Sequence, residues 1–376
     1  MGFKKECGRR WRMILTAALL LFGCAGSLAG CSASGTGNAE AGSSQDAAGN
    51  GSSQNAAAGD GRLQVAATIF PYYDFLRQIG GDRIGLQLVV PAGMDSHSFE
   101  PTPADMIAMQ EADILVCNGG AMEQWVSQVL SSLDTGGMEV LTMMDYVDVV
   151  EEELVEGMED ADHGHDHSHE EDEAYDHSRE GDLDVGGQAV FDPEDGHALE
   201  IAYDEHIWTS PVNAITIVEI LCDALSQADP ENREYFEANA AAYTQELADL
   251  DARFRRIVEN GKRRMFVVAD KFPLRYFADT YGLSYRAAFS GCSTDTEPSA
   301  KTIAYLIDQV WEQEIPAVYY LELSSHRTAE IIGEETGAAS LLFHSCHNVT
   351  RREFDGGVRY LQLMNQNAVN LEIGLN

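Results

Sequence analysis

One pattern repeats from Arg62 to the C-terminus: a short apolar run, a turn and then an amphipathic stretch. The apolar runs predict strands and the amphipathic stretches predict helices. The runs in the first part of this region are "RLQVAATIF", "IGLQLVV", "DILVCN" and "MEVLTM", and those in the last part are "RMFVVAD", "LSYRAAF", "AVYYLEL" and "ASLLF". Strands that alternate with helices are typical of parallel sheets covered by helices, so the pattern predicts an α/β fold.

A long helix is predicted between the two sets of strands, from 230 to 261. Its apolar residues are spaced alternately four and three apart, which places them on one face of a helix: Phe236, Ala240, Tyr243, Leu247, Leu250, Phe254 and Ile257. At 1.5 Å per residue, such a helix is about 40 Å long. We therefore expect two lobes, residues 62–229 and 262–376, each a mainly parallel sheet flanked by helices, joined by this single long helix.

An acidic insertion interrupts the first lobe at about residues 150–203, which are dense in Asp and Glu. In this insertion, "DHGHDHSHEED" places four histidines at alternate positions, and His177 follows closely. The candidate ligands of the insertion are His163, His165, His167, His169 and His177. Imidazole and carboxylate both bind divalent transition metals, so the segment is predicted to bind metal ions. The alternative is a solvated charged loop, because so polar a segment does not fold alone.

The N-terminus predicts secretion and a membrane anchor. Residues 1–30 combine a basic start, the apolar run "MILTAALLLFG" and the small residues "SLAG", a pattern typical of signal peptides. "LAGC" resembles the lipobox of bacterial lipoproteins, which predicts a lipid on Cys31; the alternative is a plain signal peptide with an incidental cysteine. Residues 31–61 are mostly Gly, Ala, Ser, Asn and Gln and predict a flexible tether. We expect a lipid-anchored protein that faces outward from the cell membrane.

Charge and cysteine content narrow the function further. The formal net charge is −38 and 44% of the residues are hydrophobic, so folded cores with a strongly acidic surface are expected. Such a surface repels nucleic acid and favours a cationic ligand. Cys117 and Cys222 lie in apolar stretches and are predicted to be buried. Cys292 and Cys346 lie in polar loops, and the sequence leaves open whether they form a disulfide.

Three histidines outside the acidic insertion are candidate metal ligands. His97 follows the predicted strand "IGLQLVV", His344 ends the predicted strand "ASLLF", and His206 lies in "DEHIWTSP". Ligand sites in α/β folds lie at the carboxyl ends of strands, where at least two of these residues are expected.

Several stretches carry a resemblance to a known family. They are "PAGMDSHSFEPTPAD", "DEHIWTSPVNA", "EPSAKT" and "LMNQNAVNL". They resemble motifs of the metal-binding receptor lipoproteins of ABC importers for zinc and manganese, and the resemblance covers about residues 62–376. One departure is that the family usually has proline before the first ligand histidine, where this chain has Ser96.

The resemblance implies a divalent cation between two α/β lobes, with His97 and His206 as ligands from the first lobe. The second lobe departs from the family pattern. Where the family generally has histidine or glutamate, the nearest candidate here is Asp270 in "VVADKFPLRYF". Where the family has an aspartate at a strand end, this chain has "LLFHSCHN", so His344 is the first choice and His347 the alternate.

Glu322, at the end of "YYLEL", is a further candidate. It is predicted either to orient a ligand imidazole or simply to be an acid near the N-terminus of a helix.

Three imidazoles and one carboxylate suit tetrahedral zinc, whereas manganese prefers more oxygen ligands. We therefore expect a monomeric zinc receptor that delivers the ion to an ABC permease powered by a separate ATPase chain, without enzymatic chemistry of its own. By the same resemblance, the histidine-rich insertion collects or senses zinc. The alternatives are a manganese receptor, an adhesion lipoprotein of the same fold, or a zinc-dependent hydrolase, although the chain has no HExxH or GxSxG motif.

Overall fold

The computed structural model describes residues 61–158, 190–191, 198–199, 202–291, 293 and 297–376. The predicted signal peptide, the tether, Cys31, the five candidate ligand histidines of the acidic insertion and Cys292 lie outside these residues. In the part of the chain that the structure describes, no helix combines the length and the apolar character needed to cross a membrane.

The first lobe contains a four-stranded parallel sheet in the order β2-β1-β3-β4. Its strands are β1 (Leu63–Ala67), β2 (Ile84–Leu88), β3 (Ile114–Cys117) and β4 (Glu139–Thr142). Its helices are α1 (Phe70–Gly80), α2 (Pro103–Gln110), α3 (Gln124–Ser132) and α4 (Pro211–Ala228). All four residues of β3 are buried, as expected for a central strand of a parallel sheet that is covered on both faces.

The second lobe repeats this arrangement with the order β10-β9-β7-β8, which is the same topology read from the other edge. Its strands are β7 (Met265–Val268), β8 (Ser284–Ala287), β9 (Ala317–Tyr320) and β10 (Ala339–Leu342). Its helices are α6 (Arg275–Tyr281), α7 (Ala300–Glu312), α8 (Arg327–Thr336), α9 (Arg351–Asp355) and α10 (Tyr360–Leu375). The predicted fold class, two mainly parallel α/β lobes, is confirmed.

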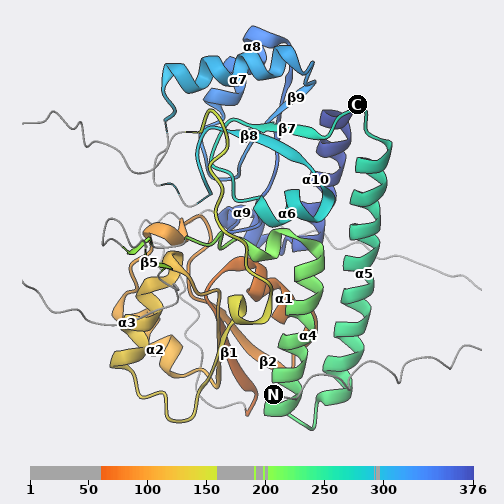
Figure 1. Cartoon of the computed structure of the whole chain (residues 1–376). Coiled ribbons are helices and arrows are strands. Elements are labelled where there is room, and N and C mark those ends of the chain that lie inside the picture. Colours follow the sequence, from red (N-terminus) through yellow and green to blue (C-terminus); the bar gives the residue numbers. More distant parts are fainter. Residues whose placement is uncertain (1–60, 159–189, 192–197, 200–201, 292, 294–296) are drawn as a thin grey trace, which may run out of the picture. The chain divides into compact units, whose positions relative to one another are not determined.

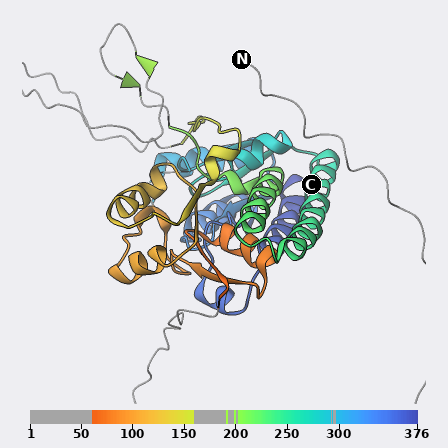
Figure 2. The ribbon, with the colours of Figure 1, turned by 90° about the horizontal axis from the view of Figure 1, so that it is seen from below.

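The long helix is α5 (Arg233–Asn260), and every residue of its predicted apolar stripe is buried. It packs against α1 and α4 of the first lobe and against α10 of the second (Figure 1). Viewed from below, α4, α5 and α10 lie side by side (Figure 2). The burial of one stripe against both lobes explains why this helix links them.

Short segments at the ends of the strands complete the first lobe. They include the 3₁₀ helices η1 (Ser96–Ser98), η2 (Ala121–Glu123), η3 (Met143–Tyr146) and η4 (Ile207–Thr209). The acidic insertion also contains one short antiparallel pair, β5 (Val190–Phe191) and β6 (Ala198–Leu199).

In each main sheet the first and third strands are neighbours. The chain leaves these two strands in opposite directions, which opens a crevice at their carboxyl ends. The candidate ligands cluster near this crevice.

Candidate metal site

Three histidines from distant parts of the sequence converge between the lobes: His97, His206 and His347. Their candidate ligand nitrogens all lie within 4.8 Å of one another. The ring centroids are 5.9 Å apart for His97 and His206, 5.4 Å for His97 and His347, and 5.6 Å for His206 and His347. Tetrahedral zinc with bonds of about 2.0 Å holds its ligand nitrogens about 3.3 Å apart. A small movement of the rings therefore suffices for one ion to bind all three.

His97 enters the site on η1, directly after the turn that follows β2. The Asp95 carboxylate caps η1 by accepting a hydrogen bond from the backbone N–H of His97 at 3.0 Å. His97 is partly buried, so its ring can reach both the protein interior and the cavity.

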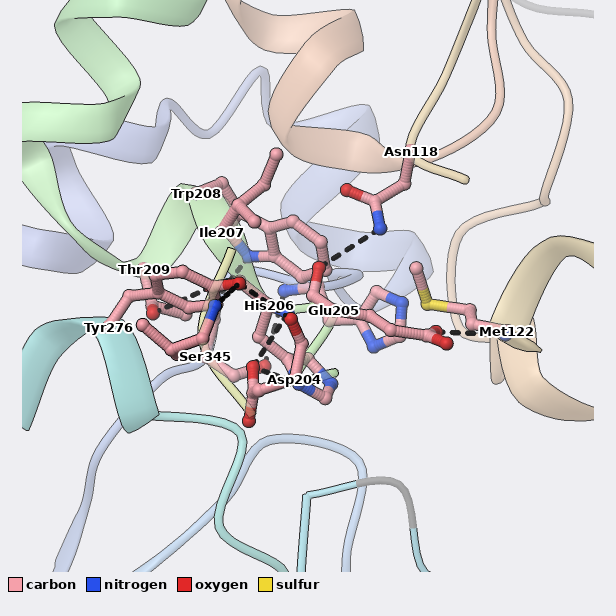
Figure 3. A network of polar contacts seen from close by, with 12 residues as sticks. Asn118, Met122, Asp204, Glu205, His206, Ile207, Trp208, Thr209, Tyr276 and Ser345 are labelled. Atoms are coloured by element: carbon pink, nitrogen blue, oxygen red, sulfur yellow. Dashed lines mark hydrogen bonds and ion pairs between the residues drawn. The ribbon is translucent and has the colours of Figure 1, made fainter. Parts of the chain in front are cut away.

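The His206 segment is held by a network of polar contacts (Figure 3). The Asp204 carboxylate accepts a hydrogen bond from the backbone N–H of His206 at 2.8 Å and lies 3.2 Å from its Nδ1 atom. The Tyr276 hydroxyl donates to the Asp204 backbone carbonyl at 2.7 Å. An aspartate on Nδ1 fixes the orientation of the imidazole and leaves Nε2 for a metal, an arrangement common at histidine ligands.

Glu205 attaches the same segment to η2 (Figure 3). Its carboxylate accepts hydrogen bonds from the backbone N–H groups of Ala121 and of Met122, the latter at 2.8 Å. The side-chain amide of Asn118, which follows β3, donates to the Glu205 carbonyl at 2.9 Å. Because Asp204 and Glu205, the two residues before it, are both bonded to other segments, His206 has little freedom to move.

The second lobe contributes His347 from the loop after β10. Its ring lies 5.1 Å from the ring of Trp208, centroid to centroid. The hydroxyl of Ser96 contacts its Nε2 atom across the two lobes. The structure thus brings together the alternate candidate, His347, with His97 and His206.

Two of these three rings are held in the neutral form, which favours metal binding. Burial, followed by repulsion from His206, lowers the pKa of His97 to about 4. Burial, followed by repulsion from His97 and His206, lowers the pKa of His347 well below its usual range. Burial alone would lower the pKa of His206, but the Asp204 carboxylate outweighs it and raises the pKa. Near neutral pH, His97 and His347 are therefore neutral and have lone pairs to offer, as metal ligands must.

His344, the first choice from the sequence, lies outside this group of three. Its ring is buried, and its Nδ1 atom accepts the backbone N–H of Cys346 at 2.9 Å. The side-chain oxygen of Asn367 accepts the backbone N–H of His344, and the side-chain nitrogen of Asn367 donates to the His344 carbonyl, each at 2.7 Å. Its Nε2 atom is buried and meets no hydrogen-bonding partner among the described residues. The chain turns at Cys346, whose φ of 63° lies in the left-handed region, and the next residue is the one that reaches the cavity.

Asp270 and Glu322 line the same cavity, of about 370 Å³, but do not belong to the group of three. Asp270 follows β7, and its Oδ1 atom accepts the backbone N–H of Lys271 at 2.8 Å. Burial raises the pKa of Asp270, while a hydrogen bond from Ser324 acts in the opposite direction. Glu322 accepts hydrogen bonds from the backbone N–H and the hydroxyl of Ser345 at 2.7 and 2.5 Å, so it fixes the loop after β10.

The described cysteines are buried, and none of them is bonded to another described cysteine: Cys117, Cys222 and Cys346. The predicted burial of Cys117 and Cys222 is confirmed. Burial also raises the pKa of the Cys346 thiol well above its usual range. Cys292 lies outside the described residues, so the question of a disulfide between Cys292 and Cys346 stays open.

Comparisons with known proteins agree on one family. Residues 65–374 match the model of the family described as ZnuA, zinc-uptake complex component A, periplasmic. The zinc-binding lipoprotein AdcA of Streptococcus pneumoniae is 31% identical over 313 residues, which cover 83% of this chain and 56% of AdcA. The high-affinity zinc uptake system protein ZnuA of Bacillus subtilis is 30% identical over 330 residues, covering 88% of this chain and 93% of that protein. This chain thus spans little more than half the length of its streptococcal relatives.

Solved structures share the fold. The Zn(II)-bound ZnuA-like domain of Streptococcus pneumoniae AdcA superposes with a TM-score of 0.63 and 27% identity, covering 84% of this chain and 99% of that domain. The metal-dependent lipoprotein YcdH of Bacillus subtilis gives a TM-score of 0.64 and 27% identity, with coverage of 84% and 99%.

Proposed function

Because the chain belongs to the family of zinc-uptake complex component A, we propose that it is an extracytoplasmic receptor that captures zinc between its lobes for an ABC importer. The observation that carries the proposal is the convergence of three imidazoles from both lobes within 4.8 Å. The names of AdcA and of the Bacillus subtilis ZnuA, as a zinc-binding lipoprotein and a zinc uptake protein, support it.

The proposed ligands are His97, His206 and His347, with Asp270 as the fourth. Three imidazoles favour zinc over manganese, which prefers more oxygen ligands. Asp270 lines the cavity and is already bonded to its own lobe, so it would have to turn toward the ion. With four protein ligands no exchangeable water remains on the ion, and a receptor without enzymatic chemistry is the function that fits.

Release follows from the division of the ligands between the lobes. His97 and His206 belong to the first lobe and His347 to the second, so an ion held by all three bridges them. A permease that binds better to a conformation in which His347 has moved away lowers the affinity for zinc, because a partner acts only through its difference in affinity for two states. The ATPase that drives transport would be a separate chain.

The proposal also includes a membrane location for the protein and a role for the acidic insertion. A lipid on Cys31 and the tether of residues 31–61 would hold the receptor, as a monomer, at the outer side of the cell membrane. The histidines of the acidic insertion, such as His163 and His165, would collect or sense zinc before its transfer to the cleft. The relatives named lipoproteins support the anchor.

Competitive titration with zinc and manganese against a chromophoric chelator tests the proposal. We expect the full chain to bind one zinc ion tightly and to prefer zinc to manganese. The double variant His97→Ala/His206→Ala should lose this tight site, and a variant lacking residues 159–180 should keep it. Loss of tight binding in the deletion variant alone would show instead that the acidic insertion is the zinc site.

A further inference from the structure

The loop that carries His347 is fastened to the first lobe by hydrogen bonds. The side-chain amide of Asn348 donates to the carbonyl of Pro91 at 2.9 Å and to the carbonyl of Met94 at 2.6 Å. The indole N–H of Trp208 donates to the carbonyl of Ser345 at 2.9 Å. Residues 345–348 are therefore bonded to both first-lobe segments that carry the other two histidines.

The geometry of Asn348 commits its amide nitrogen to the first lobe. Asn348 is 5% exposed, and its Oδ1 atom accepts the backbone N–H of Val349 at 2.7 Å within its own loop. The amide nitrogen then points away from that loop, and its two hydrogens serve the two carbonyls of the first lobe. All hydrogen-bonding atoms of this side-chain amide are used, as a buried amide requires.

Few residues and hydrogen bonds separate Asn348 from His97. The two carbonyls belong to one turn, which is closed by the backbone N–H of Met94 donating to Pro91 at 3.1 Å. Asp95, the next residue, caps η1 through the N–H of His97. On the other side, Asn348 is the immediate neighbour of His347. One side chain thus connects the backbones of two candidate ligands that belong to different lobes.

We propose that Asn348 is a positioning residue, which sets the distance between His347 and His97 so that the three imidazoles are arranged for one ion before it binds. This inference rests on the proposed zinc site. Hydrogen-bonding partners behind metal ligands typically contribute a factor of about 10 to 100 in metal affinity. The expected effect of removing the Asn348 amide is of that size.

Other contacts hold the lobes together without Asn348. The buried carboxylate of Asp74 in α1 accepts the backbone N–H of Tyr360 in α10 at 2.7 Å. The Tyr360 hydroxyl donates to the Trp208 carbonyl at 2.7 Å, and α5 packs on both lobes. Loss of the Asn348 bonds should therefore loosen the His347 loop relative to the turn before His97, while the bond from Trp208 to Ser345 and the fold are kept.

Asn348→Asp is the variant that tests the role of the two amide donors most directly. It keeps the size and the acceptor for Val349 but removes both donors, and it places a carboxylate oxygen against two carbonyls. Asn239→Ala is the control, because it too removes a hydrogen bond from a side-chain amide to a backbone carbonyl. Asn239 in α5 donates to the carbonyl of Ile79 in α1 at 3.0 Å, outside the group of histidines. Asn348→Ser, which retains one short donor, replaces Asn348→Asp if the latter does not fold.

The test is zinc affinity of the full chain, with a competing chelator that keeps weaker sites empty, together with the visible spectrum of the cobalt-loaded protein. We expect Asn348→Asp to raise the zinc dissociation constant about 10- to 100-fold and to change the cobalt bands, which report the ligand geometry. Asn239→Ala should leave both unchanged.

The outcomes separate this inference from the proposed function. Wild-type affinity and a wild-type cobalt spectrum in Asn348→Asp, in a chain that loses zinc on His347→Ala, would overturn the positioning role alone. A wild-type chain without a tight zinc site would overturn both.

Discussion

Glu123 carries a pH dependence of stability that can be worked out from the structure. It lies in η2, is 3% exposed, and its Oε2 atom accepts the backbone N–H groups of Asn118 at 2.6 Å and Gly119 at 3.0 Å. Burial raises its pKa from 4.5 to about 7, although these hydrogen bonds act in the opposite direction. Asn118 in turn holds the segment of His206, so the charge of Glu123 affects the part of the fold next to the metal site.

The sign follows from proton binding. In the unfolded chain the carboxyl ionises near pH 4.5, whereas in the folded protein it ionises only near pH 7, so the folded state binds more protons in between. Stability must therefore fall as pH rises through this window. At about 1.36 kcal/mol per pKa unit the full cost is about 3 kcal/mol, of which about 2 kcal/mol develops between pH 5.5 and pH 8.

Glu123→Gln removes the charge and keeps an oxygen for the two backbone N–H groups. We expect the free energy of unfolding of this variant, relative to that of the wild type, to increase by about 2 kcal/mol from pH 5.5 to pH 8. Urea unfolding of the metal-free full chain at both pH values measures the difference, and the same substitution at the exposed Glu111 serves as the surface control. A difference between Glu123→Gln and wild type that does not change with pH would refute the reasoning.

Three further predictions concern the metal site. His347→Ala should abolish tight zinc binding, whereas His344→Ala should retain it, and competitive titration that gives the reverse order would restore the first choice from the sequence. Asp204→Ala should weaken zinc binding about 10- to 100-fold because it removes the partner of His206 Nδ1, and an unchanged dissociation constant would show that this contact is not needed. Zinc at 100 times its dissociation constant should raise the free energy of unfolding of the wild type by about 2.7 kcal/mol, and calorimetry of the His97→Ala/His206→Ala variant should show no such increase.

Periodicity was sufficient to predict the fold because the pattern and the packing have the same physical origin. The stripe from Phe236 to Ile257 in α5 is buried as the spacing of four and three predicts. Thr102 and Asp105 form the capping box that opens α2, which local sequence alone indicates. Such features depend on residues that are close to one another in the sequence, so the sequence alone indicates them.

The second-lobe ligand could not be predicted in the same way. His344 ends the apolar run of β10, so the rule that ligands lie at strand ends favoured it over His347. The direction of each side chain depends instead on the left-handed turn at Cys346 and on the bonds from Asn367, which join residues more than twenty positions apart. The partner of Asn348 lies 257 positions away at Pro91, and no local pattern predicts such a pair.

The central claim is that His97, His206 and His347 hold one zinc ion between the lobes. Crystals of the zinc-loaded protein, measured on both sides of the zinc absorption edge, test it most directly. We expect the strongest anomalous peak to lie about 2.0 to 2.1 Å from one nitrogen of each of these three rings. A strongest peak at any other residues, with none between these rings, would contradict it.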